Sequence, residues 1–124
     1  MQAIMALEQD GLDLSNWTTQ LRKGLLELCI VNLLAKGEVY GYDLVKQMAS
    51  VEQLVVTEGT LYPLLSRLKK AGLVQSRLEE SSNGPARKYY QLTPAGRREL
   101  AVMSTYFHSL TGALLALESS PPPP

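Results

Sequence analysis

Residues that build metal sites and disulfide frameworks are scarce in this sequence. Its 124 residues include one cysteine, Cys29, and one histidine, His108. A single cysteine excludes an internal disulfide and a zinc site built from a cysteine cluster, and it fits a reducing cytoplasm. No cysteine, second histidine or carboxylate stands at metal-ligand spacing from His108, so the sequence predicts no metal and no other cofactor.

Long apolar runs are also missing. The first ten residues lack a basic region and are interrupted by Gln2, Glu8 and Asp10, which argues against a signal peptide. The apolar run at 25–35 contains Glu27 and Asn32 and is too short to cross a bilayer. The chain is therefore expected to be cytoplasmic, with no membrane partner.

Catalytic motifs are absent as well. The sequence has no phosphate-binding loop, no dinucleotide fingerprint and no acid pair. Ser66 and Lys69 match the S-x-x-K pattern of penicillin-recognising enzymes, but the partner motifs are missing and the chain is too short for that fold. We therefore expect no enzymatic activity.

What is present is the pattern of one small domain, mainly α with a β-hairpin. The length and the 45% hydrophobic content suit a single compact core. Apolar periodicity predicts helices at 17–36, after Gly41, from Thr57 to Gly72 and from Pro94 to about Glu118. Residues 73–79 and 87–92 alternate like strands. Asn83-Gly84 between them is a hairpin signal, because both residues tolerate a positive φ.

Capping residues are expected at the helix ends. Ser15 or Asn16 can cap the first helix, and Gly37 stands where a left-handed conformation would end it. Thr57 and Thr93 stand in the N-cap positions of the third and last helices. The first helix has apolar residues around nearly its whole circumference, so we expect it to be buried on most sides.

The third helix has two different faces. Its apolar residues form one stripe at helical spacing: Leu61, Leu64, Leu65, Leu68 and Ala71. The opposite face is polar, basic and aromatic, and it carries Gly59, Tyr62, Pro63, Ser66 and Lys70, flanked by Arg67 and Lys69.

The last helix carries the a/d pattern of a coiled-coil seam. Apolar residues recur there at spacings of three and four: Leu100, Met103, Phe107, Leu110, Leu114 and Leu117. Because the helix is longer than so small a core can cover, its free face is expected to pair with a second copy in a homodimer. The predicted parts are an N-terminal extension at 1–16, a unit at 17–93, a dimerisation helix at 94–118 and a disordered proline-rich tail at 119–124.

Charge is unevenly distributed along the chain, although the net charge is zero. Residues 60–98 hold eight basic and two acidic residues, a net charge of +6. The remaining residues hold four basic and ten acidic ones, a net charge of −6. A neutral chain can therefore present a basic face to double-stranded DNA.

The order helix, short helix, helix, hairpin is that of a winged helix-turn-helix, whose third helix enters the major groove while the hairpin, or wing, touches the flanking backbone. The predicted DNA-binding residues lie on these two elements: Thr57, Gly59, Thr60, Tyr62, Pro63, Ser66, Arg67, Lys70, Ser82, Asn83, Arg87 and Lys88. Arg67 is favoured for reading base edges and Lys88 for contacting phosphates. The alternative is a protein-interaction adaptor that keeps this fold without specific DNA binding.

Three strings resemble the PadR-type transcriptional regulators: GTLYPLLSRL at 59–68, AGLV at 71–74 and RKYYQLTPAG at 87–96, with YGY at 40–42. The resemblance covers about residues 21–117. It implies a homodimeric repressor with a winged-helix domain and a C-terminal dimerisation helix, which binds inverted repeats. Chains with one C-terminal helix resemble the smaller branch of the family, some members of which bind flat aromatic drugs between the subunits.

Aromatic residues near the expected seam raise the question of a small hydrophobic effector. Trp17, Tyr106 and Phe107 could clamp a flat ligand and so alter the spacing of the two recognition helices. Ordinary core packing is the alternative, and the seam position of Phe107 favours it.

Overall fold

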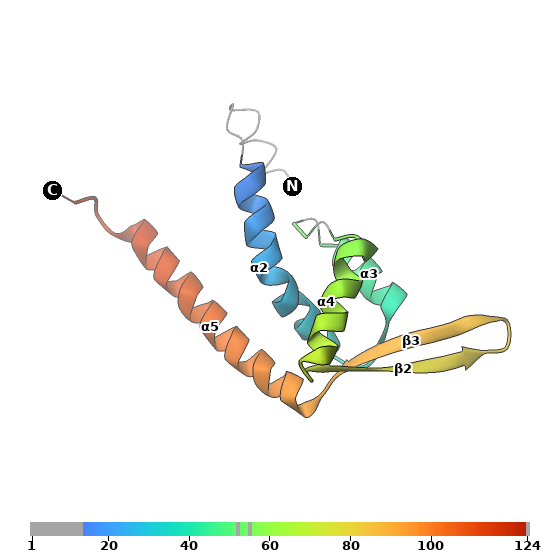
Figure 1. Ribbon diagram of the computed structural model, residues 1–124. Coiled ribbons are helices and arrows are strands. Elements are labelled where there is room, and N and C mark those ends of the chain that lie inside the picture. Colours follow the sequence, from blue (N-terminus) through green and yellow to red (C-terminus); the bar gives the residue numbers. More distant parts are fainter. Residues whose placement is uncertain (1–13, 52, 55, 124) are drawn as a thin grey trace.

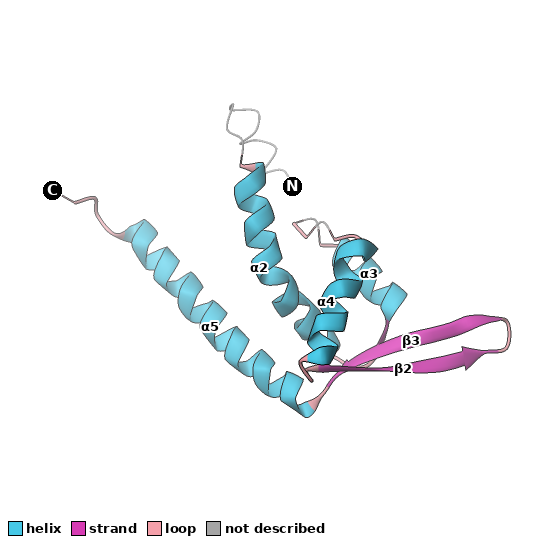
Figure 2. Cartoon of the chain, viewed as in Figure 1, coloured by secondary structure: helices cyan, strands magenta, loops and turns pink. Residues whose placement is uncertain are grey.

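The computed structural model describes residues 14–51, 53, 54 and 56–123, so nearly all of the expected extension at 1–16 lies outside the described residues. The elements follow in the order α2 (Ser15–Leu34), β1 (Val39–Tyr40), α3 (Gly41–Ala49), α4 (Glu58–Lys70), β2 (Val74–Ser81), β3 (Gly84–Leu92) and α5 (Pro94–Ser119) (Figure 1). The expected class, mainly helical with a small antiparallel sheet and a long C-terminal helix, is confirmed (Figure 2).

The core lies where α2, α3 and α4 meet the base of the sheet. Ile30, Leu34, Leu44, Leu61 and Leu65 are fully buried there. Only the C-terminal half of α2 joins this core, since Trp17 and Leu21 on its first turns are 61% and 48% exposed. The expectation that this helix is buried on most sides is therefore wrong within a single chain. The wing and α5 extend from the core on different sides, the wing to the right and α5 to the upper left in Figure 1.

The sheet has one strand more than expected. β1 pairs antiparallel with β3, which gives the order β1-β3-β2. Two residues carry no alternating pattern, so β1 has no signal of its own in the sequence. The strand matters because it anchors the wing to the start of α3, which follows Tyr40 directly.

The wing turn differs from the expected one. Ser82 and Asn83 form the turn and Gly84 already belongs to β3, where Ser81 is paired with Gly84. Among the described residues only Gly37 and Gly72 have a positive φ, so the expected left-handed Asn83-Gly84 turn is wrong. An irregular register between Glu79 and Ser81 accompanies the turn instead, and such bulges supply the extra twist that a hairpin needs.

Helix capping agrees with the sequence in part. The N-cap of α2 is Leu14 without a side-chain bond, so the expected cap by Ser15 or Asn16 is wrong. Thr57 is the N-cap of α4, but its side chain makes no capping hydrogen bond. Thr93 is the N-cap of α5, and its Oγ1 accepts a hydrogen bond from the Gly96 amide at 3.0 Å.

The Thr93 hydroxyl has a second role. It donates to the carbonyl oxygen of Gly72 at 2.6 Å. Gly72 follows α4 in the left-handed conformation, with φ of 79°, that ends many helices. One side chain therefore joins the end of α4 to the start of α5.

We expect Thr93→Ala to lower the free energy of unfolding by about 2 kcal/mol, because it removes a cap and leaves the Gly72 carbonyl without its partner. Urea denaturation followed by circular dichroism measures this loss. Thr57→Ala is the matched control, since the Thr57 hydroxyl makes no capping bond, and it should change stability by less than about 0.5 kcal/mol. Equal losses in both variants would contradict the bridging role of Thr93.

Candidate nucleic-acid interface

The polar face of α4 points to solvent, as its sequence pattern predicts. Leu61, Leu65 and Leu68 are buried, and this fixes the orientation of the helix. All the α4 residues that the sequence assigns to DNA are exposed: Gly59, Thr60, Tyr62, Pro63, Ser66, Arg67 and Lys70. Thr57, at the start of the helix, is exposed too.

A hollow of about 400 Å³ lies between α4 and the sheet. Its lining brings helix and wing residues together: Tyr40, Gly41, Tyr62, Leu65, Ser66, Lys69, Lys88 and Tyr90. Tyr62, Ser66 and Lys88 are residues that the sequence assigns to DNA. Tyr40 and Lys69 were not assigned, because nothing in the local pattern shows that β1 and the last turn of α4 border the same hollow.

Gly41 allows the close packing beneath this hollow. A Cβ atom at that position would lie 3.1 Å from Tyr90 Cε2 and 3.4 Å from Tyr62 Cε1. Burial raises the pKa of the Tyr62 and Tyr90 hydroxyls. Both hydroxyls therefore stay protonated at neutral pH and can serve as hydrogen-bond donors.

Arg67 is engaged within the chain. Its guanidinium forms an ion pair with Glu27 of α2, although the Arg67 side chain is 64% exposed. Lys69, two residues further along α4, donates to Ser76 Oγ at 2.8 Å. A bidentate base contact through both terminal nitrogens of Arg67 therefore requires the pair with Glu27 to open.

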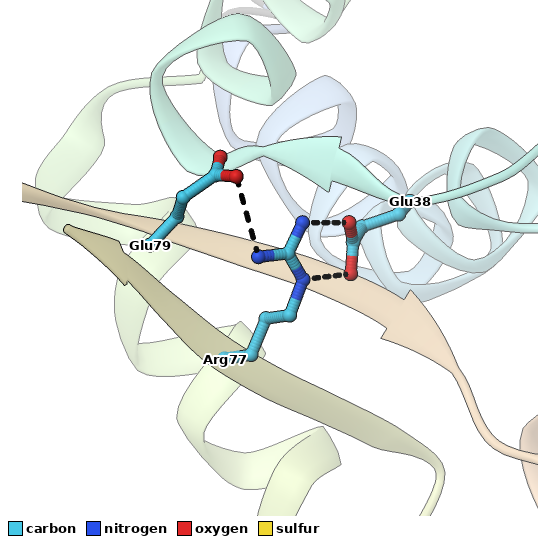
Figure 3. A network of polar contacts seen from close by, with 3 residues as sticks. All are labelled: Glu38, Arg77 and Glu79. Atoms are coloured by element: carbon cyan, nitrogen blue, oxygen red, sulfur yellow. Dashed lines mark hydrogen bonds and ion pairs between the residues drawn. The ribbon is translucent and has the colours of Figure 1, made fainter. Parts of the chain in front are cut away.

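Arg77 of β2 makes more polar contacts within the chain than Arg67 does. Its Nε and Nη2 donate to the two carboxylate oxygens of Glu38 at 2.8 and 2.6 Å, and its Nη1 lies 3.9 Å from Glu79 Oε1 (Figure 3). The Arg77 hydrogen bond holds the pKa of the Glu38 carboxyl below its usual range. The ion pairs of Arg67 with Glu27 and of Arg77 with Glu38 offset two of the eight positive charges counted between residues 60 and 98. The basic face is therefore smaller than the sequence implies.

The remaining cations of the wing lie over tyrosine rings. The Arg87 guanidinium lies 5.1 Å from the ring centroid of Tyr40, and Lys88 Nζ lies 5.9 Å from that of Tyr90. Among the described residues neither cation makes an ion pair. Ser82 and Asn83 are exposed at the wing tip. The wing thus presents two cations that a phosphate can reach.

The predicted seam of α5 divides into two halves. Leu100 and Met103 pack against the core of their own chain. Leu110, Leu114 and Leu117 are 45%, 50% and 70% exposed. By length and composition α5 could also cross a membrane, and none of its apolar window is buried within the chain. The C-terminal half of the helix therefore leaves an apolar surface to be covered.

The residues considered for an effector lie close to this surface. A cavity of about 340 Å³ between α2 and α5 is lined by Met103, Tyr106, Phe107 and Leu110 together with residues of α2. Trp17 is not in that lining, so the structure brings together two of the three aromatic residues proposed from the sequence. No group of three potential metal ligands occurs in the part of the chain that the structure describes.

Comparison with known proteins gives consistent matches. Residues 30–102 match the sequence model of the PadR-like family of transcriptional regulators. A transcriptional regulator of Mycobacterium tuberculosis is 37% identical over 81 residues, which are 65% of this chain and 74% of the relative.

Solved structures agree over most of the chain. A PadR family regulator from Eggerthella lenta has a TM-score of 0.79 and 31% identity, covering 94% of this chain and 99% of that structure. A PadR-like regulator from Bacillus cereus has a TM-score of 0.73 and 35% identity, covering 82% and 99%.

Proposed function

Because the chain belongs to the PadR-like family of transcriptional regulators, we propose that it is a homodimeric repressor that binds an inverted-repeat operator in the cytoplasm. The family is not enzymatic, and it implies DNA binding and dimerisation. In this proposal residues 17–93 bind DNA and residues 94–118 join the two copies. The sequence indicated the same division.

One observation supports the mode of binding most directly. Ser66 and Tyr62 of α4 border the same hollow as Lys88 of the wing. A duplex whose major groove receives α4 would therefore place a backbone phosphate within reach of the wing. In a dimer the two copies of α4 would address half-sites about 34 Å apart, one turn of the duplex.

The test begins with selection of a preferred duplex from a random-sequence library by the wild-type protein. Fluorescence anisotropy then compares the selected duplex with a shuffled one over a series of salt concentrations. The proposal requires the selected duplex to bind roughly 10³-fold more tightly. Weak and equal binding of both duplexes would reject it and would favour the adaptor alternative.

An effector that relieves repression is the second part of the proposal, supported by the apolar cavity beside Tyr106 and Phe107. The same titration is repeated with a panel of flat hydrophobic compounds. Operator affinity should fall with at least one compound of the panel. An unchanged affinity across a broad panel would contradict this part alone.

We expect Lys88→Ala to weaken binding to the selected and the shuffled duplex by the same factor. The reason is that a lysine on a phosphate contributes affinity without reading sequence. The slope of log affinity against log salt should fall by about one. Lys23→Ala removes the same charge from the exposed part of α2 and should leave the slope unchanged. A loss confined to the selected duplex would show that Lys88 reads sequence.

A further inference from the structure

Arg77 is flanked by carboxylates, which compete with a DNA phosphate for its guanidinium group. Two of its guanidinium nitrogens donate to Glu38 and the third faces Glu79 (Figure 3). The bidentate arrangement is the strong and geometrically specific form of the arginine-carboxylate pair. Arg77 is thus a wing cation that is already neutralised, whereas Arg87 and Lys88 further along the wing make no ion pair among the described residues.

The pair also spans the sheet. Glu38 immediately precedes β1 and Arg77 lies on β2, at opposite edges of the order β1-β3-β2. The two side chains meet over the central strand β3. There Tyr89 is the register partner of both Arg77 and Tyr40, and its ring centroid lies 4.7 Å from the Arg77 guanidinium. Glu38 and Arg77 therefore form a strap across the base of the wing.

Stability alone does not account for this strap. The side chains of Arg77 and Glu38 are 49% and 27% exposed, and exposed ion pairs contribute little to the free energy of unfolding. The effect on DNA binding is larger, because every additional phosphate contact raises affinity for all sequences alike. An arginine freed at the wing base would favour non-specific DNA.

We propose that Glu38 is a positioning residue that acts through Arg77 to favour specific over non-specific DNA. It withholds one cation from phosphates and fixes the base of the wing, so that the wing contacts the backbone mainly when α4 lies in its groove. The inference rests on the proposed DNA binding and goes beyond it, since Glu38 itself touches no DNA.

The test uses Glu38→Gln, which keeps the shape of the side chain and removes its charge. The variant should bind the shuffled duplex roughly threefold or more tightly at low salt, with a salt slope steeper by about one. It should gain less on the selected duplex, because the wing is no longer held in place, so the ratio of the two affinities falls. Adding Arg77→Gln to this variant should return the slope to the wild-type value.

Glu79→Gln is the matched control. It changes the net charge by the same amount on the other side of Arg77, but Glu79 makes no hydrogen bond with Arg77 and lies 3.9 Å from it. Its salt slope and affinity ratio should stay close to wild type. Thermal melting of all variants shows whether they remain folded.

Four results would overturn the inference. Equal effects of Glu38→Gln and Glu79→Gln would show a general effect of charge. Equal weakening on both duplexes, with a lower melting temperature, would show a purely structural role. If the wild type enriches no sequence from the library, the proposed function fails and the inference fails with it, whereas normal enrichment with an unchanged ratio in Glu38→Gln rejects the inference alone.

Discussion

Gly96→Ala should lower the free energy of unfolding by about 3 kcal/mol, the largest loss we expect from the addition of one methyl group to this chain. Gly96 is buried in the first turn of α5. A Cβ atom there would lie 2.1 Å from the carbonyl oxygen of Leu73. That oxygen belongs to the backbone and accepts a hydrogen bond from the Thr93 amide, so no side-chain rotation can relieve the clash.

Urea denaturation measures this effect, and Gly112→Ala is its control. Gly112 is a glycine of the same helix, and a Cβ atom there would meet nothing within 4 Å. Alanine is the better helix former, so this control should be as stable as wild type or more stable by up to about 1 kcal/mol. If Gly96→Ala and the control unfold at the same urea concentration, the start of α5 can accommodate a methyl group and the expected clash is wrong.

Leu114→Asp should separate the proposed dimer and weaken binding to the selected duplex by roughly 10²- to 10⁴-fold, the range by which linking two binding modules raises affinity. Leu114 is half exposed in the single chain and lies in the apolar half of the α5 seam. A carboxylate buried against a second helix would lose its hydration without gaining a partner. The fold of each chain should survive, because Leu114 is not part of the core.

Sedimentation velocity and anisotropy on the selected duplex test this expectation. Thr105→Asp introduces the same charge nine residues earlier, which is two and a half turns away and thus on the opposite side of α5. That control should remain dimeric and bind as wild type does. A Leu114→Asp protein that stays dimeric would show that the two copies meet elsewhere.

Local signals in the sequence account for most of the elements. The apolar stripe of α4 fixed which of its faces is buried, and Thr93-Pro94 marked the start of α5 correctly, because both signals act within a few residues. The turn was misplaced at Asn83-Gly84, since the bulge beside Glu79 depends on how the two strands pair and not on which residues tolerate a positive φ.

The interface was predictable as a list of residues but not as an arrangement. Tyr62, Ser66 and Lys88 were expected on DNA, and the structure brings them around one hollow. The partners of Arg67 and Arg77 could not be expected, because Glu27 and Glu38 lie 40 and 39 residues away along the chain. Pairing over such distances is decided by how the helices and strands pack.

The Thr93 bridge couples the orientation of the long helix α5 to that of α4. α5 has 26 residues and is therefore roughly 39 Å long. Its start is fixed to the end of α4 by the hydrogen bond from the Thr93 hydroxyl to the Gly72 carbonyl. A change of about 5° in the angle between α5 and α4 would move the far end of α5 by roughly 3 Å over this length. Conversely, a displacement of several ångströms between the far ends of two paired α5 helices corresponds to a rotation of only a few degrees at α4.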